Sequence, residues 1–117
     1  MSAAPRRPRL PSLTHLQFLV LGGLIAAADA RLGRELRTEL GRHGVRRSAP
    51  AFYQMMARLE DAGWVDGFYT QQVVDGQIIK ERGYRITAAG SRAWTATRDF
   101  YADAATRFAK AAGLEPA

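Results

Sequence analysis

The chain has 117 residues, enough for one domain with a modest hydrophobic core and no cross-links. It contains no cysteine, which excludes disulfides, thiolate metal sites and cysteine nucleophiles. The net charge is +6, and it is unevenly distributed. Up to Arg58, ten arginines face three acids, a net of +7; from Leu59 onward, seven basic residues face eight acids, a net of −1. This asymmetry favours a polyanionic partner for the N-terminal half, although composition alone leaves RNA or a membrane surface open.

Residues 1–11 read as a flexible arm in which arginines alternate with prolines. Such an arm is either a solubilising tail or a segment that reaches along DNA. It has no apolar stretch of the kind that a signal peptide carries, and the apolar run that follows is too short to span a bilayer. The cytoplasm is therefore the expected compartment, and no membrane partner is expected.

A first helix is predicted from the N-cap Thr14 to about Ala28, apolar on nearly every side. A chain this small has little material to cover such a helix, which indicates that part of it meets a second subunit. Gly22 and Gly23 would let another helix approach closely. The residues that we predict at this interface are Leu16, Leu19 and Leu24.

Asp29 and Ala30 are expected to form a short break before a second helix, from Arg31 to about His43, which Gly44 ends. A basic connector, Val45 to Arg47, leads to a third helix between Ser48 and Gly63. Two short helices joined by a Gly-containing turn form a helix-turn-helix pattern.

The third helix has two unlike faces. Ser48 is the predicted N-cap, Pro50 fits the first turn, and Gly63 fits the position after the helix. Core residues recur at helical spacing at Phe52, Met55, Met56 and Leu59. The opposite face has no acid up to Arg58, and its aromatic, amide and guanidinium groups suit DNA bases and phosphates. Taken alone, the segment also fits an ordinary amphipathic core helix.

A hairpin is predicted next, because Phe68 to Val74 and Gln77 to Thr87 are rich in β-branched and aromatic residues and flank Asp75-Gly76. Lys80, Arg82 and Arg85 lie on the returning strand. After two helices, such a basic hairpin is typical of the wing of a winged helix, which lies along flanking phosphates. A purely structural ribbon is the alternative.

A last helix is predicted from about Ala88 to Ala112, capped by Thr87. Its apolar stripe has too little remaining chain to cover it, so we predict that it dimerises. The interface residues predicted here are Trp94, Thr97, Tyr101, Ala104 and Phe108. The fold class is thus mainly α with a small β-hairpin (α+β): a winged helix-turn-helix over residues 12–87 with an additional C-terminal dimerisation helix over residues 88–113.

The order of these parts resembles the PadR-like family of winged-helix transcriptional regulators. Three stretches carry the resemblance, namely LTHLQFLVLGGL at 13–24, SAPAFYQMMARLEDAGWV at 48–65 and YRITAAG at 84–90. Within them Phe52-Tyr53, Arg58-Leu59-Glu60 and Gly63-Trp64-Val65 fit the family pattern. The chain departs from that pattern at Gln54, where the family usually has proline, and at Gly83, where an aromatic residue is expected. Residues 30–36 also replace the family's usual Tyr-Gly-Tyr-Glu-Leu.

The resemblance implies a homodimer that binds a two-fold-related operator on double-stranded DNA, usually as a repressor, with the first and last helices at the dimer interface. We expect base or sugar contacts from Tyr53, Gln54, Pro50 and Ala57, near the cap Ser48. Phosphate contacts are expected from Arg46, Arg47, Arg58, Lys80 and Arg82.

Other readings receive less support from the residues. Trp94 either packs the interface or lines a slot for a small aromatic effector. A protein-interaction adaptor that keeps the fold but has no operator is the alternative function, and the arginine-rich half argues against it.

His15 and His43 lie far apart, each without a second ligand at metal spacing, so neither a metal nor a cofactor is expected. No phosphate loop or catalytic constellation indicates an enzyme.

Overall fold

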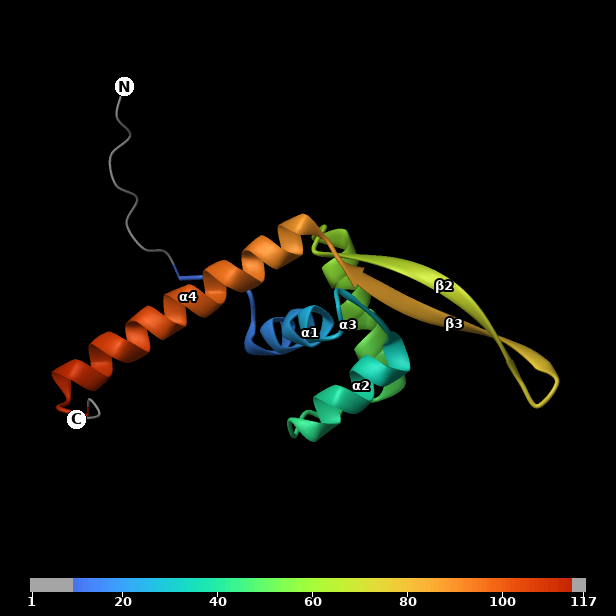
Figure 1. Ribbon diagram of the computed structural model, residues 1–117, viewed down its shortest axis with the longest axis horizontal. Coiled ribbons are helices and arrows are strands. Elements are labelled where there is room, and N and C mark those ends of the chain that lie inside the picture. The colour runs from blue at the N-terminus through green and yellow to red at the C-terminus, as the bar shows by residue number, and fades with distance from the viewer. Residues whose placement is uncertain (1–9, 115–117) are drawn as a thin grey trace, which may run out of the picture.

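The computed structural model describes residues 10–114, which form four helices and three strands (Figure 1). Most of the predicted arm, residues 1–11, lies outside this range. In chain order the elements are α1 (His15–Ala26), β1 (Ala30–Leu32), α2 (Gly33–Arg42), α3 (Ala49–Asp61), β2 (Val65–Val74), β3 (Gln77–Ile86) and α4 (Ala88–Ala111). The predicted α+β class, with four helices and a hairpin, is confirmed.

Three helices begin at the predicted caps, because a side-chain oxygen satisfies a free backbone N–H in each first turn. The hydroxyl of Thr14 accepts from the Gln17 amide at 3.1 Å, and the Gln17 side chain accepts from the Thr14 amide at 2.9 Å, which completes a capping box. Ser48 accepts from the Ala51 amide at 3.3 Å. Thr87 accepts from the Gly90 amide at 3.0 Å.

The segment between α1 and α2 differs from the prediction. Helix α1 ends at Ala26 instead of Ala28, and both Ala28 and Asp29 have positive φ, at 57° and 76°. Residues 30–32 then pair with residues 83–85 as strand β1, so α2 begins at Gly33 and not at Arg31. The leucine spacing suggested an earlier start, but sheet hydrogen bonds satisfy the backbone of residues 30–32 instead.

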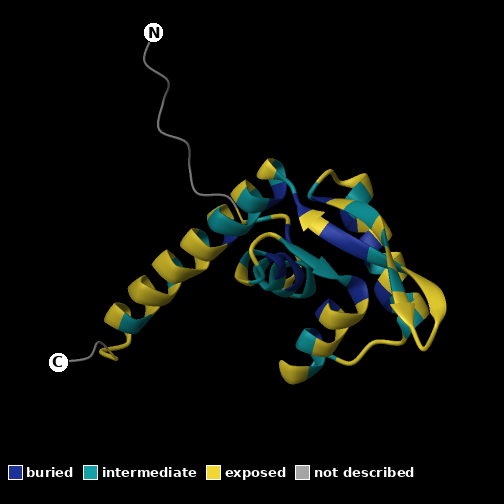
Figure 2. Ribbon diagram, turned by 45° about the vertical axis from the view of Figure 1, so that its right-hand side comes forward, coloured by how far each residue is buried: buried dark blue, intermediate teal, exposed yellow. Residues whose placement is uncertain are grey.

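The core lies where α1, α2 and α3 meet the base of the sheet (Figure 2). Leu21, Leu36 and Phe52 are each fully buried, and they come from the three different helices. The inward stripe of α3 is completed by Met56 and Leu59, also fully buried, as the spacing predicted. Because this face is buried, the opposite face of α3 is left on the surface.

The sheet has the strand order β1-β3-β2, and it becomes a two-stranded ribbon beyond the Leu32–Gly83 pair. Strand β2 begins at Val65, earlier than the predicted Phe68. Asp75 and Gly76 both have positive φ, 51° and 77°, as a two-residue type I′ turn requires. The ribbon projects from the body as the predicted wing, away from α4 (Figure 1).

Helix α4 has 24 residues, a length of roughly 36 Å at 1.5 Å per residue. Its first turns pack on α1 and on the loop after α3, where Gly90 is needed because a β-carbon would collide with the Trp64 carbonyl. The C-terminal turns extend beyond the body and are largely exposed (Figure 2).

Candidate nucleic-acid interface

The outward face of α3 presents the side chains that the sequence assigned to DNA. Pro50, Gln54, Ala57 and Arg58 are exposed, and Tyr53 is 37% exposed. No carboxylate lies on the helix between Ser48 and Arg58. A surface with amide, aromatic and guanidinium groups and no negative charge can approach the edges of bases without repulsion from phosphates.

Tyr53 also has a packing role. A β-carbon at Gly33 would lie 3.0 Å from both Cε1 and the hydroxyl of Tyr53, so the ring rests against the first residue of α2. The ring also meets Phe52 edge-on, with centroids 5.1 Å apart. Tyr53 therefore joins α3 to α2 as well as facing solvent.

An arginine-rich groove of about 770 Å³ runs between α2 and the start of α3. The backbone at its centre is braced by Arg37, whose Nε donates to the carbonyl of Arg47 at 2.9 Å. Arg46 and Arg47 are exposed, as expected. The residues that line this groove are Arg34, Arg37, Thr38, Gly41, Arg42, Val45, Arg46, Arg47, Ala49 and Tyr53.

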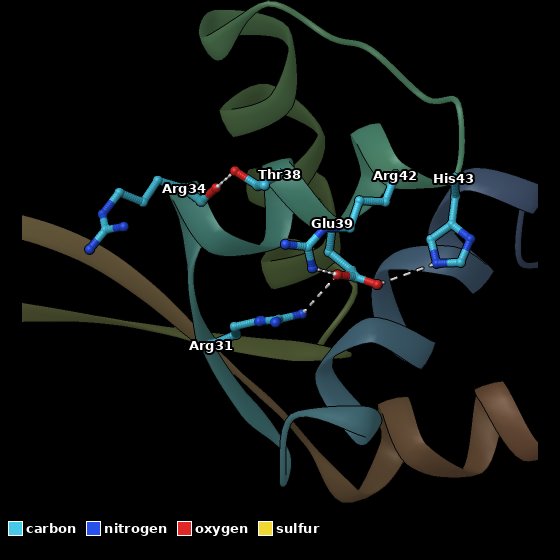
Figure 3. Close-up of polar contacts among 6 residues, drawn as sticks. All are labelled: Arg31, Arg34, Thr38, Glu39, Arg42 and His43. Carbon is cyan, nitrogen blue, oxygen red and sulfur yellow. Dashed lines mark hydrogen bonds and ion pairs between the residues drawn. The ribbon is translucent and has the colours of Figure 1, made fainter.

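Three of these arginines, Arg34, Arg37 and Arg42, were not assigned from the sequence. Two of them are partly neutralised, since Arg34 pairs with Glu81 at 2.6 Å and Arg42 pairs with Glu39 at 2.8 Å. Figure 3 shows Arg34 pointing away from the Glu39 cluster. Within residues 10–114, Arg37, Arg46 and Arg47 form no ion pair and so keep their full charge for a polyanion.

A second, smaller cavity of about 260 Å³ lies between the start of α1 and α3. It brings together Arg47, Gln54 and Arg58 from the predicted DNA-contacting set. Leu16, predicted at the dimer interface, lines the same cavity and is half-buried. The structure thus gathers the α3 residues and the basic connector on one surface.

The wing contributes less free charge than expected, because Arg82 is engaged inside the protein. Its guanidinium donates to Glu60 of α3 at 2.7 Å and lies 4.6 Å from the centroid of the Tyr69 ring. Burial opposes the charged form of Arg82, but the hydrogen bond and charge of Glu60 help to raise its pKa above the usual value. Arg82 is therefore partly neutralised by a brace between α3 and the wing, and its phosphate contact stays a prediction.

Two glycines make room for this arrangement. A β-carbon at Gly67 would collide with both the Arg82 guanidinium and the Glu60 carboxylate. A β-carbon at Gly83 would collide with the ring of Phe68, which lies across that residue. The family has an aromatic residue at position 83. In this chain Gly83 leaves that space free, and the Phe68 ring of the neighbouring strand occupies it. Lys80 remains exposed, with its Nζ 4.4 Å from the centroid of Tyr69.

The residues predicted for the dimer interface differ widely in exposure. Leu24 is fully buried in the core and Thr97 is 3% exposed, with its hydroxyl bonded to the Ala93 carbonyl at 2.8 Å, so neither offers surface to a second copy. Leu19 and Ala104 are half-buried. Tyr101 and Phe108 are 42% and 74% exposed.

Trp94 packs within its own chain. Its ring stacks on Phe18 with centroids 5.3 Å apart and planes 7° apart, and the Arg98 guanidinium lies 5.3 Å from its centroid. The indole N–H is buried against Gly22 and has no hydrogen-bond partner in residues 10–114. Trp94 also borders a cavity of about 250 Å³ lined by Phe18, Leu19, Gly22, Gly23, Ala26, Arg31, Leu36, Glu39, Leu40, His43 and Trp94.

The polar rim of this cavity is centred on Glu39 (Figure 3). Its carboxylate lies 2.8 Å from Arg42, 3.4 Å from His43 and 3.9 Å from Arg31. The hydrogen bond from Arg42 is the main cause that lowers the pKa of Glu39.

Across residues 10–114, no group of three or more His, Cys, Asp or Glu side chains is placed to hold a metal ion. None of the described helices is long and apolar enough to cross a membrane.

No protein-family model and no curated protein matches the sequence. Solved structures do match the fold. A transcriptional regulator from Clostridium thermocellum has a TM-score of 0.63 at 18% identity and covers 82% of this chain and 88% of its own. A PadR family transcriptional regulator from Eggerthella lenta DSM 2243 has a TM-score of 0.59 at 22% identity, with coverages of 86% and 88%. F93 from STIV, a winged-helix DNA-binding protein, has a TM-score of 0.54 at 15% identity, with coverages of 77% and 91%.

The chain therefore has the winged-helix fold found in transcriptional regulators, a PadR family member among them. The resemblance read from the sequence is confirmed at the level of the fold.

Proposed function

We propose that this protein is a sequence-specific DNA-binding regulator that represses transcription in the cytoplasm as a homodimer on a two-fold-related operator. The observation that carries the proposal is the exposed, acid-free face of α3 flanked by Arg46, Arg47 and Arg58. A helix with such a face suits the major groove, while the flanking guanidinium groups suit phosphates. The similarity of the fold to winged-helix regulators supports the same reading.

A gel shift with the promoter region of its own gene is the direct test. We expect a shifted band that persists against excess competitor DNA of unrelated sequence. Failure to bind that promoter or any other duplex would contradict the proposal, and would favour the alternative of an interaction adaptor.

Sequence discrimination is assigned to Gln54, whose amide can donate and accept at a base edge. Replacing Gln54 by alanine should reduce the preference for operator over unrelated DNA by roughly a hundred-fold, because one bidentate contact is worth about 1–3 kcal/mol and a dimer loses two of them. Binding to unrelated duplexes should stay within about two-fold of wild type. Competition assays with both DNAs measure the two effects. A parallel loss on both would show that Gln54 does not read bases.

Homodimerisation is supported by the exposed half of α4. Tyr101 and Phe108 lie on one stripe of the helix and, with Leu114, leave large apolar side chains in solvent. A two-fold dimer would bury the same stripe from both copies and would present two α3 helices to two half-sites.

A small aromatic effector is supported by the cavity beside Trp94, which is mostly apolar and has Glu39 at its rim. Trp64 and Trp94 are the only tryptophans, so the Trp64→Phe variant reports Trp94 alone. We expect phenolic or planar cationic compounds to quench this fluorescence saturably, and to leave the Trp94→Phe variant unchanged. If quenching is linear, or equal in both variants, Trp94 only packs the protein.

A further inference from the structure

The tip of the wing is apolar rather than basic. Val73 and Ile78 are 74% and 71% exposed, while Val74 and Ile79 are 44% and 39% exposed. Asp75 at the turn adds a negative charge. A tip built only to follow phosphates would carry lysine or arginine, so these four side chains need another explanation.

The two faces of the ribbon differ in charge. The register pairs Tyr69 with Arg82, Gln71 with Lys80, and Val73 with Ile78, and alternation along a strand puts these three pairs on one face. That face carries Arg82, which pairs with Glu60 of α3, and Lys80, which forms no ion pair within residues 10–114. The other face carries Asp66 opposite the cation Arg85, Glu81, which pairs with Arg34, and the apolar Val74 and Ile79. The first face, with its unpaired Lys80, is the better suited to DNA.

This cationic face is continuous with the exposed side of α3. Tyr69 and Arg82 share one cavity with Tyr53, Ala57 and Glu60, and they share a second with Tyr53, Lys80 and the Arg34–Glu81 ion pair. The Glu60–Arg82 brace fixes the base of the wing to α3. A duplex that contacts α3 would therefore meet Tyr69 first, then Lys80, and finally the Val73–Ile78 pair.

The reach of the wing fits the spacing of the grooves. Four residues separate Tyr69 from Val73, about 13 Å at 3.3 Å per residue. Half a turn of B-DNA, about 17 Å, separates the middle of the major groove from the middle of the neighbouring minor groove. The roughly 13 Å from Tyr69 to Val73 add to the distance between Tyr69 and α3, so the tip lies past a phosphate backbone, on the side of the minor groove.

We infer that Val73 and Ile78 form an apolar wedge that enters the minor groove beside the major groove contacted by α3. The inference rests on the proposed function. Apolar wedges suit the minor groove because they contact sugars and base edges and partly unstack a base step, which bends the duplex. The cost is lowest at flexible TA and CA/TG steps, so the wing selects DNA flanks by deformability.

The test compares two double variants of the full chain. Val73→Thr with Ile78→Thr removes the wedge, and Val74→Thr with Ile79→Thr makes the matched change on the opposite face. Threonine is β-branched and keeps the strand propensity, so both variants retain the hairpin. Each is measured by fluorescence anisotropy on duplexes that the wild-type protein selects from a random pool, with TA-rich or with stiff A-tract flanks. Energy transfer between end labels reports the bend.

We expect the wedge variant to lose about ten-fold in affinity on TA-rich flanks, because two or three buried methyl groups are lost. It should also lose the flank preference and bend DNA less, with an unchanged salt dependence because no phosphate contact is removed. The matched variant should behave as wild type. If the wedge variant behaves as wild type, or if both variants lose the same affinity, the inference of a wedge is wrong while the proposed function stands. A change in oligomeric state without DNA assigns the tip to a protein contact and also overturns the wedge. If the wild-type protein binds no duplex, the proposed function fails with it.

Discussion

Replacing Arg46 and Arg47 together by alanine should weaken binding to every duplex, operator and unrelated DNA alike, by on the order of a hundred-fold at physiological salt. Both side chains are exposed and form no ion pair within residues 10–114, so their charge is available to phosphates. A dimer would lose four phosphate contacts, so the slope of log K against log salt should become less negative by about 3 to 4. Anisotropy titrations at several salt concentrations measure both quantities.

The control for this variant removes two charges from a different surface. Arg92 and Lys110 lie on α4, are exposed and form no ion pair in the described part of the chain. The double alanine variant at these positions has the same net charge but should keep the wild-type slope. If it loses as much affinity as the Arg46–Arg47 variant, net charge rather than a located interface explains the binding.

Replacing Phe108 by serine should convert the proposed dimer to monomers at micromolar concentration. Phe108 is 74% exposed in the single chain, and burying an aromatic side chain contributes about 1.5–3 kcal/mol. In a two-fold dimer the substitution removes this side chain from both subunits, so the dimer dissociation constant should rise by roughly a thousand-fold. Sedimentation velocity measures the change. Thr106→Ser on the opposite face of α4 is the matched control, since serine can keep the hydroxyl bond to the Ala102 carbonyl. A Phe108→Ser variant that remains dimeric would place the interface elsewhere.

Local signals in the sequence determined most of the helices. The caps at Thr14, Ser48 and Thr87 act within three residues of their partners, so they are visible without the fold. The inward stripe of α3 and the turn at Asp75-Gly76 are equally local. For the same reason, the exposure of the acid-free side of α3 could be predicted.

The features that the sequence did not reveal depend on distant partners. Strand β1 forms because residues 30–32 meet residues 83–85, and no periodicity in three residues reports such a pairing. Leu24 belongs to an apolar helix that has no polar face to indicate which side is interior, so it was placed at the interface instead of in the core. Arg82 pairs with Glu60, which lies 22 residues earlier, and no local pattern in the sequence indicates such a pairing.

The exposed tip of the wing was present in the sequence only as a run of β-branched residues. Such a run favours a strand but does not say whether the strand is covered. Only the register and the projecting ribbon show that Val73 and Ile78 share the cationic face and remain in solvent.

The salt dependence of duplex binding tests the central claim most directly. Three or four phosphate contacts in each subunit of a dimer predict a slope of log K against log salt of about −5 to −7 on any duplex of sufficient length. The measurement needs no knowledge of the operator. A slope in this range supports a DNA-binding surface around α3 and its flanking arginines, and a slope near zero would contradict it.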